Sequence, residues 1–430
     1  MLNNTHIFND PIHGIMDFNE EQKNLIVKYI DTDIFQRLRR INQLGLTDYV
    51  FSGATHSRFS HSIGACYIAK NLCENLKSSF SNQEQINATI LSALLHDVGH
   101  GPLSHSFEYI LNNDLLKDKK ISHDYGWQNK FLDEFASKSE IFKDEINLVK
   151  SIIKSKNDFK KNIVSSQLDV DRLDYLLRDS HFCGVPYGKI DLRWILKSIE
   201  VINKNSNNVL SIKSKGIGAV EHYLSARRLM NKNIYYNSKV CAVQYYYKEF
   251  ILSLEEYIDS KEFVSNNLMK FLKNYFEYKN NQTKTPNDFI NENYELYKKL
   301  TDDDIYIQLK IMNDLENKTK SSIIANYLLN RNLPNCFTID NKNYNDALNI
   351  VNDFKMTMPE NERWKVNLER FNIKTYKGEN NPIYVTQDGS AVDILDKSDI
   401  LNFHSDKDEE KYVLYADSSV SDLIRFFSCI

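Results

Sequence analysis

Apolar residues recur every three or four positions along most of this chain, a spacing that predicts helices. The pattern is clear over residues 20–46, where Asp31-Thr32-Asp33 offers an N-cap for a second helix, and over residues 58–76. Residues 85–97 are apolar on most sides, as is typical of a helix at the centre of a core, and Gly99 marks its end. Further helices are expected near residues 105–113, 126–137, 145–155, 166–180, 191–200, 218–234, 240–276 and 286–330.

Short apolar runs beside turn residues predict strands in two regions. Around residues 200–213, two such runs flank an Asn-rich turn, so we expect a β-hairpin. In the tail, a turn at Asp388-Gly389 separates further short runs. We expect strands and a final helix there, over residues 382–385, 391–394, 411–415 and 418–427. The expected fold class is therefore mainly α, a helical core with small β additions and a helical plus short-strand C-terminal region.

The chain has 430 residues and is 42% hydrophobic, enough for a substantial core and more than one domain. We expect a core over residues 1–240, a helical extension over 241–335 and an α+β region over 336–430. No apolar run reaches the roughly 18 residues that a membrane span needs, and the N-terminus has no secretion-signal pattern. Six cysteines without a CxxC pair fit a reducing compartment, so we expect a cytoplasmic protein. The net charge of −4 argues against electrostatic binding of nucleic acid by the chain as a whole, although it allows a local basic site.

Candidate metal ligands lie in three places along the chain. His61 lies within the predicted helix over 58–76, His96-Asp97 ends the central apolar helix, and Asp171 lies in a later acidic segment. Imidazole and carboxylate together suit a borderline or hard divalent ion, which can activate water at neutral pH. Adjacent residues diverge by about 100° on a helix, so His96 and Asp97 share an ion only near a helix end. The sequence therefore predicts a metal site between three helices, with positions open for water or phosphate oxygen.

Three more histidines, His100, His105 and His123, follow this dipeptide. More imidazoles than a metal needs indicate proton transfer as well as ligation. Glu108 lies three residues after His105, so on a helix its carboxylate can orient that imidazole and raise its basicity. A protonated His105 is then suited to donate to a leaving oxygen.

Two arginines accompany the candidate ligands at helical spacing. Arg58 lies three residues before His61 and is placed to clamp a phosphate beside the metal. Tyr175, Arg178 and Asp179 follow Asp171 at +4, +7 and +8. One helix face is therefore expected to carry the ligand, a stacking ring, a phosphate-binding guanidinium and a hydroxyl acceptor.

Each of these residues also has a simpler interpretation. An isolated His-Asp pair is usually a surface or capping pair, and a lone His61 is usually a core or surface histidine. Asp169, Asp171 and Asp174 alone would fit a solvated acidic face, and Tyr175 a core position. Their joint occurrence, in this order and context, favours metal binding.

These segments resemble the HD-domain phosphohydrolase superfamily, whose pattern H…HD…D is met by His61, His96-Asp97 and Asp171. Within it, the chain is most similar to the deoxynucleotide triphosphohydrolases, near the catalytic core of the animal enzymes that join a sterile-alpha-motif domain to an HD domain. The resemblance is clear over residues 6–240, weak over 240–380 and faint in the tail. It is carried by Asn9-Asp10-Pro11-Ile12-His13-Gly14, Phe35-Gln36-Arg37-Leu38-Arg39, Gln43-Leu44-Gly45, and residues 57–62 and 96–105.

In that family a dNTP is split into a deoxynucleoside and inorganic triphosphate. The resemblance implies that metal-activated water attacks the α-phosphorus while His105, oriented by Glu108, donates a proton to the leaving 5′-oxygen. His100 and His123 would bind phosphate or help to hold a second ion. The divalent ion itself is left open among Mn, Fe, Mg, Zn, Ni and Co.

The resemblance also implies a set of substrate-binding residues. Arg58 and Arg172 would neutralise phosphate charge, and Tyr175 would pack against the sugar where a 2′-hydroxyl would clash. Gln43 and Asp179 would hold the 3′-hydroxyl. Arg227 and Tyr235 match the later part of the pocket, where the adjacent Tyr236 offers a second register.

Some members of the family are tetramers activated by nucleotides bound between subunits, so the resemblance implies a homo-oligomer, dimer or tetramer, with a nucleotide effector. The implied effector positions are Asn9, Asp31, Gln36 and Arg39 on one side, with Arg193, Lys213 and Lys215 as a basic clamp. Asp31 is also a good N-cap, and the two lysines also suit an ordinary strand surface. Asn237-Ser238 stands where the family has His-Lys, which removes positive charge from the expected effector region.

Two other functions stay open at this point. One is a phosphodiesterase or nuclease of the same superfamily that acts on nucleic acid ends. The other is a non-catalytic nucleotide sensor or nucleic-acid-binding protein that kept the scaffold. The presence of every candidate ligand together with His105 favours an enzyme.

Overall fold

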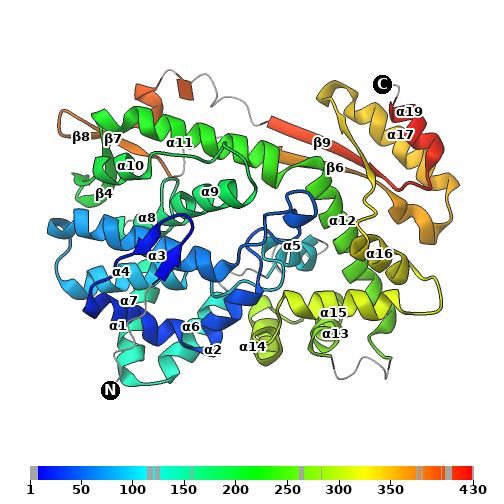
Figure 1. The fold of residues 1–430 in the computed structure, drawn as a ribbon, viewed down its shortest axis with the longest axis horizontal. Helices are drawn as coiled ribbons and strands as arrows, with labels where there is room; N and C mark the ends of the chain where they lie inside the picture. The colour runs from blue at the N-terminus through cyan, green and yellow to red at the C-terminus, as the bar shows by residue number, and fades with distance from the viewer. Residues whose placement is uncertain are drawn as a thin grey trace.

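The computed structural model describes residues 8–428, except 114–119, 122–125, 156–157, 261–265, 282, 374–375, 377, 379–380, 399 and 402–408. As the apolar spacing predicts, the protein is mainly helical, with small sheets (Figure 1). None of the helices among the described residues combines the length and the apolar character needed to span a bilayer.

Eleven helices of the described chain precede residue 236. Most of them begin after a residue whose side chain caps the helix, and Thr32 rather than Asp31 caps the second one by accepting from Phe35 N. Their bounds are α1 (Glu20–Ile30), α2 (Asp33–Gln36), α3 (Arg58–Asn75), α4 (Gln83–Leu95), α5 (His105–Asn113), α6 (Gln128–Ser137), α7 (Glu140–Lys154), α8 (Phe159–Val164), α9 (Val170–Phe182), α10 (Leu192–Ser198) and α11 (Ile217–Met230).

The helices after residue 236 are shorter than the apolar pattern suggested, because turns divide residues 240–276 and 286–330. A helix over residues 344–357 was not predicted. The bounds are α12 (Ser238–Ser253), α13 (Asn267–Asn280), α14 (Pro286–Tyr297), α15 (Asp302–Asn313), α16 (Lys320–Leu329), α17 (Tyr344–Thr357) and α19 (Ser421–Ser428).

Three small sheets accompany these helices. Hairpin β1 (Phe8–Asp10)–β2 (Gly14–Met16) was not predicted, whereas β3 (Ile199–Lys204) and β4 (Asn207–Lys213) form the predicted hairpin. The tail strands β7 (Tyr384–Gln387) and β8 (Ser390–Asp393) extend this second sheet, because β7 pairs in parallel with β4. The third sheet has the order β5-β9-β6, with bounds β5 (Asn335–Ile339), β6 (Val366–Ile373) and β9 (Glu409–Ala416).

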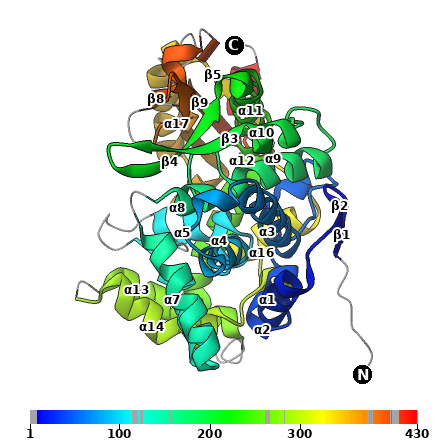
Figure 2. The same ribbon diagram turned by 90° about the vertical axis from the view of Figure 1, so that its left-hand side faces the viewer.

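The two larger sheets lie at opposite ends of α11 (Figure 1), and the view along α3 shows helices filling the space beneath them (Figure 2). One large apolar core connects the helices with the two larger sheets. Helix α4 lies inside this core, and its residues 90–95 are entirely buried. A smaller apolar cluster lies in the tail between α17, α19 and the third sheet. The three-part division of the chain stays a prediction, and both the core and the β4–β7 pairing connect its parts.

Helices α3 and α9 approach closely at Gly64. A Cβ atom on Gly64 would overlap the carboxylate of Asp174 and the guanidinium of Arg178, which form a buried ion pair on α9. Only a glycine fits there without displacing that pair.

We expect Gly64→Ala to lower the free energy of unfolding by about 3 kcal/mol, because the methyl group must separate a buried ion pair. Gly218→Ala on α11 is the matched control, since an added Cβ there meets nothing within 4 Å and should stabilise the helix by up to about 1 kcal/mol. Urea unfolding of both variants measures the difference. Equal stability of Gly64→Ala and the wild type would contradict the close approach of α3 and α9.

Candidate active site

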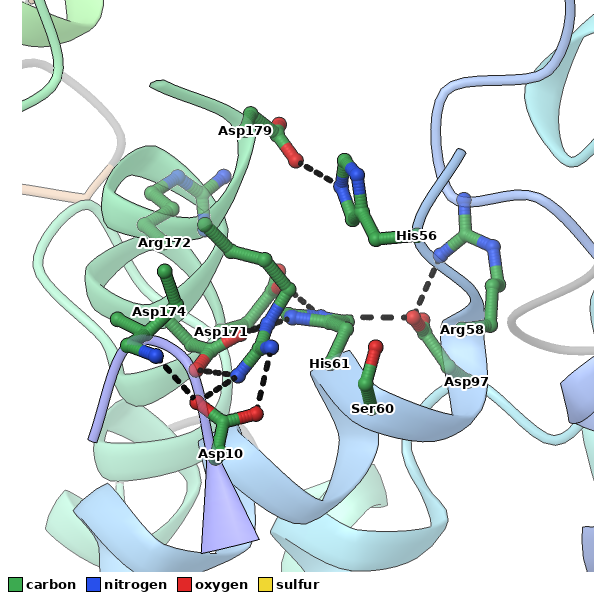
Figure 3. A network of polar contacts seen from close by, with 12 residues as sticks. Asp10, His56, Arg58, Ser60, His61, Asp97, Asp171, Arg172, Asp174 and Asp179 are labelled. Carbon is green, nitrogen blue, oxygen red and sulfur yellow. Dashed lines mark hydrogen bonds and ion pairs between the residues drawn. The ribbon is translucent and has the colours of Figure 1, made fainter. Parts of the chain in front are cut away.

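Four side chains converge from α3, α9 and the segment directly after α4, and Figure 3 shows three of them, His61, Asp97 and Asp171. His61 Nε2 lies 3.2 Å from His96 Nε2 and 3.1 Å from Asp171 Oδ1. Asp97 completes the group, with its carboxylate oxygens 3.3 Å from His96 Nε2 and 3.5 Å from His61 Nε2. His61, His96 and Asp171 each offer one ligand atom within 4.8 Å of the others, which makes this a possible His/Asp metal site.

The second nitrogen of each imidazole indicates how the rings are used. His61 Nδ1 lies 2.8 Å from the Asp174 carboxylate, and His96 Nδ1 lies 2.7 Å from the carbonyl oxygen of Ala93. Both partners are acceptors, so a ring that has given up its second proton, as a metal ligand must, donates from Nδ1 and turns the lone pair of Nε2 toward the other ring. Two lone pairs that face each other beside two carboxylates suit a bound cation, and the donor set therefore fits a divalent metal ion.

Helix ends bring these ligands together. Ser57 caps α3 by accepting from Ser60 N, which places His61 in the first turn. Helix α4 ends at Leu95, so His96 and Asp97 leave the helix and turn toward the same point. Gly99, which was predicted to mark the end of this helix, lies four residues beyond Leu95.

A second layer of charge lies beneath His61. The buried Asp174 carboxylate contacts His61 and also His13 Nε2, at 2.6 Å. Arg178 donates to Asp174 at 2.8 and 3.0 Å and to Asp10 at 2.8 and 3.2 Å. The network keeps Asp174 charged, and a fixed carboxylate on Nδ1 orients the His61 ring.

Arg178 therefore differs from its predicted role. Helical spacing predicted that it would lie on the substrate-facing side of α9, but its side chain has no exposed surface and its guanidinium faces Asp10 and Asp174. Arg178 lies four residues after Asp174, so these two share the side of α9 that packs on α3. It supports the site from behind and does not line the cavity.

The carboxylates control the charge of the site. Burial opposes protonation of His61, but hydrogen bonds to Asp171 and Asp174 outweigh it and raise its pKa to about 10. Burial likewise opposes ionisation of Asp97, yet Arg58 and then His96 hold its pKa well below the usual range. The pKa of Asp171 is also lowered, because its hydrogen bonds to His61 and His96 outweigh burial. The carboxylates are therefore ionised at neutral pH, as cation ligands must be.

A cavity of about 1000 Å³ opens beside the four ligands. The helical core supplies most of its wall, and Leu368 to Asn372 of β6 supply a wall from the tail. Six of the seven predicted substrate residues line it: Gln43, Arg58, Arg172, Tyr175, Asp179 and Tyr235. The seventh, Arg227, does not line it and donates to Gln167 Oε1 at 2.7 Å.

Two arginines bring positive charge to this cavity. Arg58 is almost fully buried, donating from Nη1 to Asp97 Oδ2 at 2.5 Å and from Nε to Ser104 Oγ at 2.8 Å. Arg172 pairs with Asp169, the N-cap residue of α9, and that carboxylate raises the pKa of the guanidinium. Arg172 Nε has no acceptor among the described residues, so it can donate to a ligand.

His105 is the first residue of α5 and lines the cavity with a side chain that is 70% exposed. Its Nδ1 lies 3.7 Å from Glu108 Oε2, which is ion-pair range but too long for a hydrogen bond. The His100 ring packs edge-on against His105, with centroids 4.8 Å apart, and His100 Nε2 lies 3.4 Å from Asp97. His123, the third predicted histidine, lies outside the described residues.

A polar cluster surrounds Asp179 at another wall of the cavity. Tyr235 Oη donates to Asp179 Oδ2 at 2.7 Å, and His56 Nε2 contacts Asp179 Oδ1 at 2.8 Å (Figure 3). The Tyr175 and Tyr235 rings meet edge to face, with centroids 6.2 Å apart. Sequence reasoning missed His56, because it precedes α3 in a segment without periodicity. It also missed His13, although that residue lies in Asp10–Gly14, a segment that carried the family resemblance.

The predicted effector residues form two groups on different elements. Arg39 donates to Gln36 Oε1 at 2.7 Å and lies 3.5 Å above the Phe59 ring, while Asn9 is exposed on β1 and Asp31 ends α1. The basic group lies around the exposed Trp194 of α10, whose Nε1 donates to Lys215 O at 3.2 Å. That group comprises Arg193 on α10, Lys213 at the end of β4 and Lys215 in the short turn Ser214–Gly216 that follows β4.

Comparisons with known proteins agree with this geometry. Residues 58–179 match the family model described as "HD domain", a range that begins at Arg58 and contains all four converging ligands. A deoxynucleoside triphosphate triphosphohydrolase homologue of Dictyostelium discoideum is 37% identical over 199 residues, 41% of this chain and 36% of that protein. An uncharacterized protein of Methanocaldococcus jannaschii is 37% identical over 235 residues, 54% of this chain and 46% of that protein. The matches thus span half or less of these relatives.

A solved structure is similar over nearly the whole chain. The crystal structure of a phosphohydrolase from Bacteroides thetaiotaomicron is 29% identical, with a TM-score of 0.77, and the similarity covers 96% of this chain and 99% of that one. The tail sheet and the helices after residue 236 therefore belong to an arrangement that the two proteins share.

We expect Asp171→Ala to weaken Mn²⁺ binding at least about 10-fold, because one of four convergent ligands is removed. Isothermal titration of metal-stripped protein with Mn²⁺ measures the affinity. Asp133→Ala is the control, since Asp133 is an exposed carboxylate on α6 that pairs with Lys150. Unchanged affinity in Asp171→Ala would remove this residue from the ligand set.

Proposed function

Because the chain contains an HD domain and is related to deoxynucleoside triphosphate triphosphohydrolases, we propose that it is a metal-dependent hydrolase that splits a dNTP into deoxynucleoside and inorganic triphosphate. The observation that carries the proposal is the convergence of two imidazoles and two carboxylates at the wall of a cavity that also holds two arginines. A bound divalent cation would lower the pKa of water and neutralise phosphate charge.

His61, His96, Asp97 and Asp171 would hold that cation, one of Mn, Fe, Mg, Zn, Ni or Co. Asp174 and the carbonyl of Ala93 orient the two imidazoles, so the ligand set is formed before the cation binds. His100 extends the same cluster through Asp97, where it would contact phosphate or a second ion.

Arg58 and Arg172 would bind the triphosphate. A chain of three phosphates brings several negative charges into a partly enclosed cavity, and guanidinium groups match phosphate oxygens in geometry and charge. Arg58 lies within hydrogen-bond reach of the ligand Asp97, so a phosphate that contacts it also lies beside the cation. Arg172 lines the same cavity, and its Nε has no acceptor among the described residues.

His105 would supply the proton that the leaving 5′-oxygen needs when the bond to the α-phosphorus breaks. Its ring is more exposed than the rings of His61, His96 and His100, and it can approach a bound substrate. Glu108 lies close enough to favour the protonated ring by charge. Its separation of 3.7 Å means that any closer pairing would form only with substrate present.

The Asp179 cluster would bind the deoxyribose. His56 and Tyr235 fix both oxygens of Asp179, and each oxygen keeps a lone pair that accepts from a 3′-hydroxyl, with Gln43 on another wall. Tyr175 lies between the metal ligands and Tyr235, where its ring would pack against the sugar. A nucleotide effector at Asn9, Asp31, Gln36, Arg39, Arg193, Lys213 and Lys215, assembly into a homo-oligomer and a cytoplasmic location belong to the same proposal.

The test incubates metal-loaded protein with each dNTP, then NTPs, then single-stranded DNA, and identifies the products by ion-pair chromatography. Triphosphate with a deoxynucleoside supports the proposal. Pyrophosphate with a monophosphate, or shortened DNA, would show a phosphodiesterase or nuclease instead. Nucleotide binding without any product would show a sensor.

We expect His105→Ala to keep Mn²⁺ affinity but to lower turnover about 100-fold or more, as the loss of a general acid does. His222→Ala, an exposed histidine of α11, should leave turnover unchanged. Steady-state kinetics and titration calorimetry measure both properties. Wild-type turnover in His105→Ala would refute the role of this residue as proton donor.

A further inference from the structure

Asp302, the first residue of α15, contacts two loops of the candidate active site. Its Oδ1 accepts from Leu103 N at 2.6 Å, and its Oδ2 accepts from Asn42 N at 2.8 Å. Leu103 belongs to residues 99–105, the His105 segment, and Asn42 belongs to residues 41–45, the Gln43 loop. One carboxylate of the helical extension therefore connects the two loops.

The His105 segment has a backbone that needs support. Leu103 and Ser104 have φ angles of 53° and 58°, in the left-handed region that non-glycine residues rarely occupy. His105 follows directly, so the direction of its side chain depends on these two residues. The helical extension holds both ends of the segment, because Tyr297 Oη donates to Gly99 O at 2.9 Å while Asp302 binds Leu103 N.

The Gln43 loop and the His105 segment touch, and the contact continues to a metal ligand. Ser104 Oγ donates to Asn42 O at 2.5 Å and accepts from Arg58 Nε, and Arg58 binds Asp97. Gly45 has a φ of 54°, and a Cβ there would lie 2.8 Å from Leu103 O. The two loops are packed as closely as their backbones allow.

We propose that Asp302 is a positioning residue of the candidate active site, which holds the Gln43 loop against the His105 segment so that Gln43, Arg58 and His105 face one substrate. The proposal rests on the proposed function for its effect on turnover. The hydrogen bonds themselves do not depend on which reaction is catalysed. The family resemblance is clear only over residues 6–240, and Asp302 lies beyond them in the helical extension.

Only an ionised carboxylate satisfies both backbone donors. An amide offers one acceptor atom and points a hydrogen at the second N–H, and a protonated acid keeps only the weaker hydroxyl acceptor at the second position. Burial raises the pKa of Asp302 to about 7, although the two backbone hydrogen bonds favour the charge. The charged and titratable groups around it are Arg37 from the turn after α2, Asp303 and Tyr306 on its own helix, and Tyr247 on α12.

Acidification is expected to weaken the contact between Asp302 and the two loops. Because the pKa of Asp302 is raised in the folded protein, protonation of Asp302 favours folding. The ionised form, which accepts from both loops, prevails only above about pH 7. A fall of pH through 7 should therefore release one of the two loop contacts.

The main variant is Asp302→Asn, which keeps the shape of the side chain and removes one acceptor. We expect kcat to fall about 10- to 100-fold with KM within about threefold, because misplaced reacting groups slow chemistry more than they weaken binding. Mn²⁺ affinity should stay within about threefold of the wild type, since no ligand is changed. Asp303→Asn is the matched control, because Asp303 is the next carboxylate of the helix, exposed and paired with Arg40.

Two results of this comparison would overturn the proposal. One is a kcat of Asp302→Asn within twofold of the wild type. The other is a parallel loss of Mn²⁺ affinity, which would indicate a general structural role. The ratio of wild-type to variant kcat should also shrink toward one as pH falls below 7, and a constant ratio would count against the proposal.

Hydrogen exchange tests the contact without reference to activity. In Asp302→Asn, peptides that contain Asn42 or Leu103 should exchange at least about 10-fold faster than in the wild type, with no change in Asp303→Asn. A wild-type protein that hydrolyses no dNTP yet shows this pattern would refute the proposed function while supporting the role of Asp302. If Asp302→Asn does not fold, the wild type decides. Corrected for intrinsic rates, the protection of at least one of the two peptides should fall from pH 8 to pH 6, and constant protection of both would overturn the proposal.

Discussion

The buried carboxylate of Asp174 is the interaction on which the candidate metal site depends. An isolated charge at this depth would be strongly disfavoured, but Arg178 neutralises it and His13 and His61 share its remaining acceptor positions. These partners hold the pKa of Asp174 well below its usual range despite burial. Because Asp174 stays charged and fixed, His61 presents Nε2 to His96 and Asp171. The same cluster explains why α3 has a glycine where it crosses α9.

Loops as well as helices form the candidate active site. The four converging ligands come from helix ends and first turns, and loop residues such as Gln43, Leu103 and Ser104 line part of the cavity beside them. The left-handed backbone at Leu103 and Ser104 is held by Asp302, and Gly99 by Tyr297, both from the helical extension. Strained backbone of this kind persists only where surrounding contacts determine it. The cavity also has a wall from β6, so regions outside residues 58–179, which match the family model, shape the place where a substrate would bind.

Much of the helical architecture could be predicted, because apolar spacing and capping residues are local. Helices α3 and α4, the β3–β4 hairpin and the Asp388-Gly389 turn lie where the pattern placed them. Strands β1, β2, β5 and β6 were missed, since short strands gain their order from partners elsewhere in the chain. The candidate ligands could be predicted because they form an ordered motif. The roles of His56 and Asp302 could not, because the residues that they contact lie far away in the sequence. Arg178 shows the reverse error, a correct helix position with the side chain on the buried side.

The sequence by itself determined the mainly helical class and the kinds of donor available to a cation, because both follow from residue types and their spacing. Only the tertiary structure decided which nitrogen of each histidine faces its neighbour, which arginine is buried behind the site and which reaches the cavity. It also decided that the tail extends the sheet of the core through β4 and β7. These outcomes depend on how closely distant segments approach and on the burial that results. Burial in turn determines which charges must be paired.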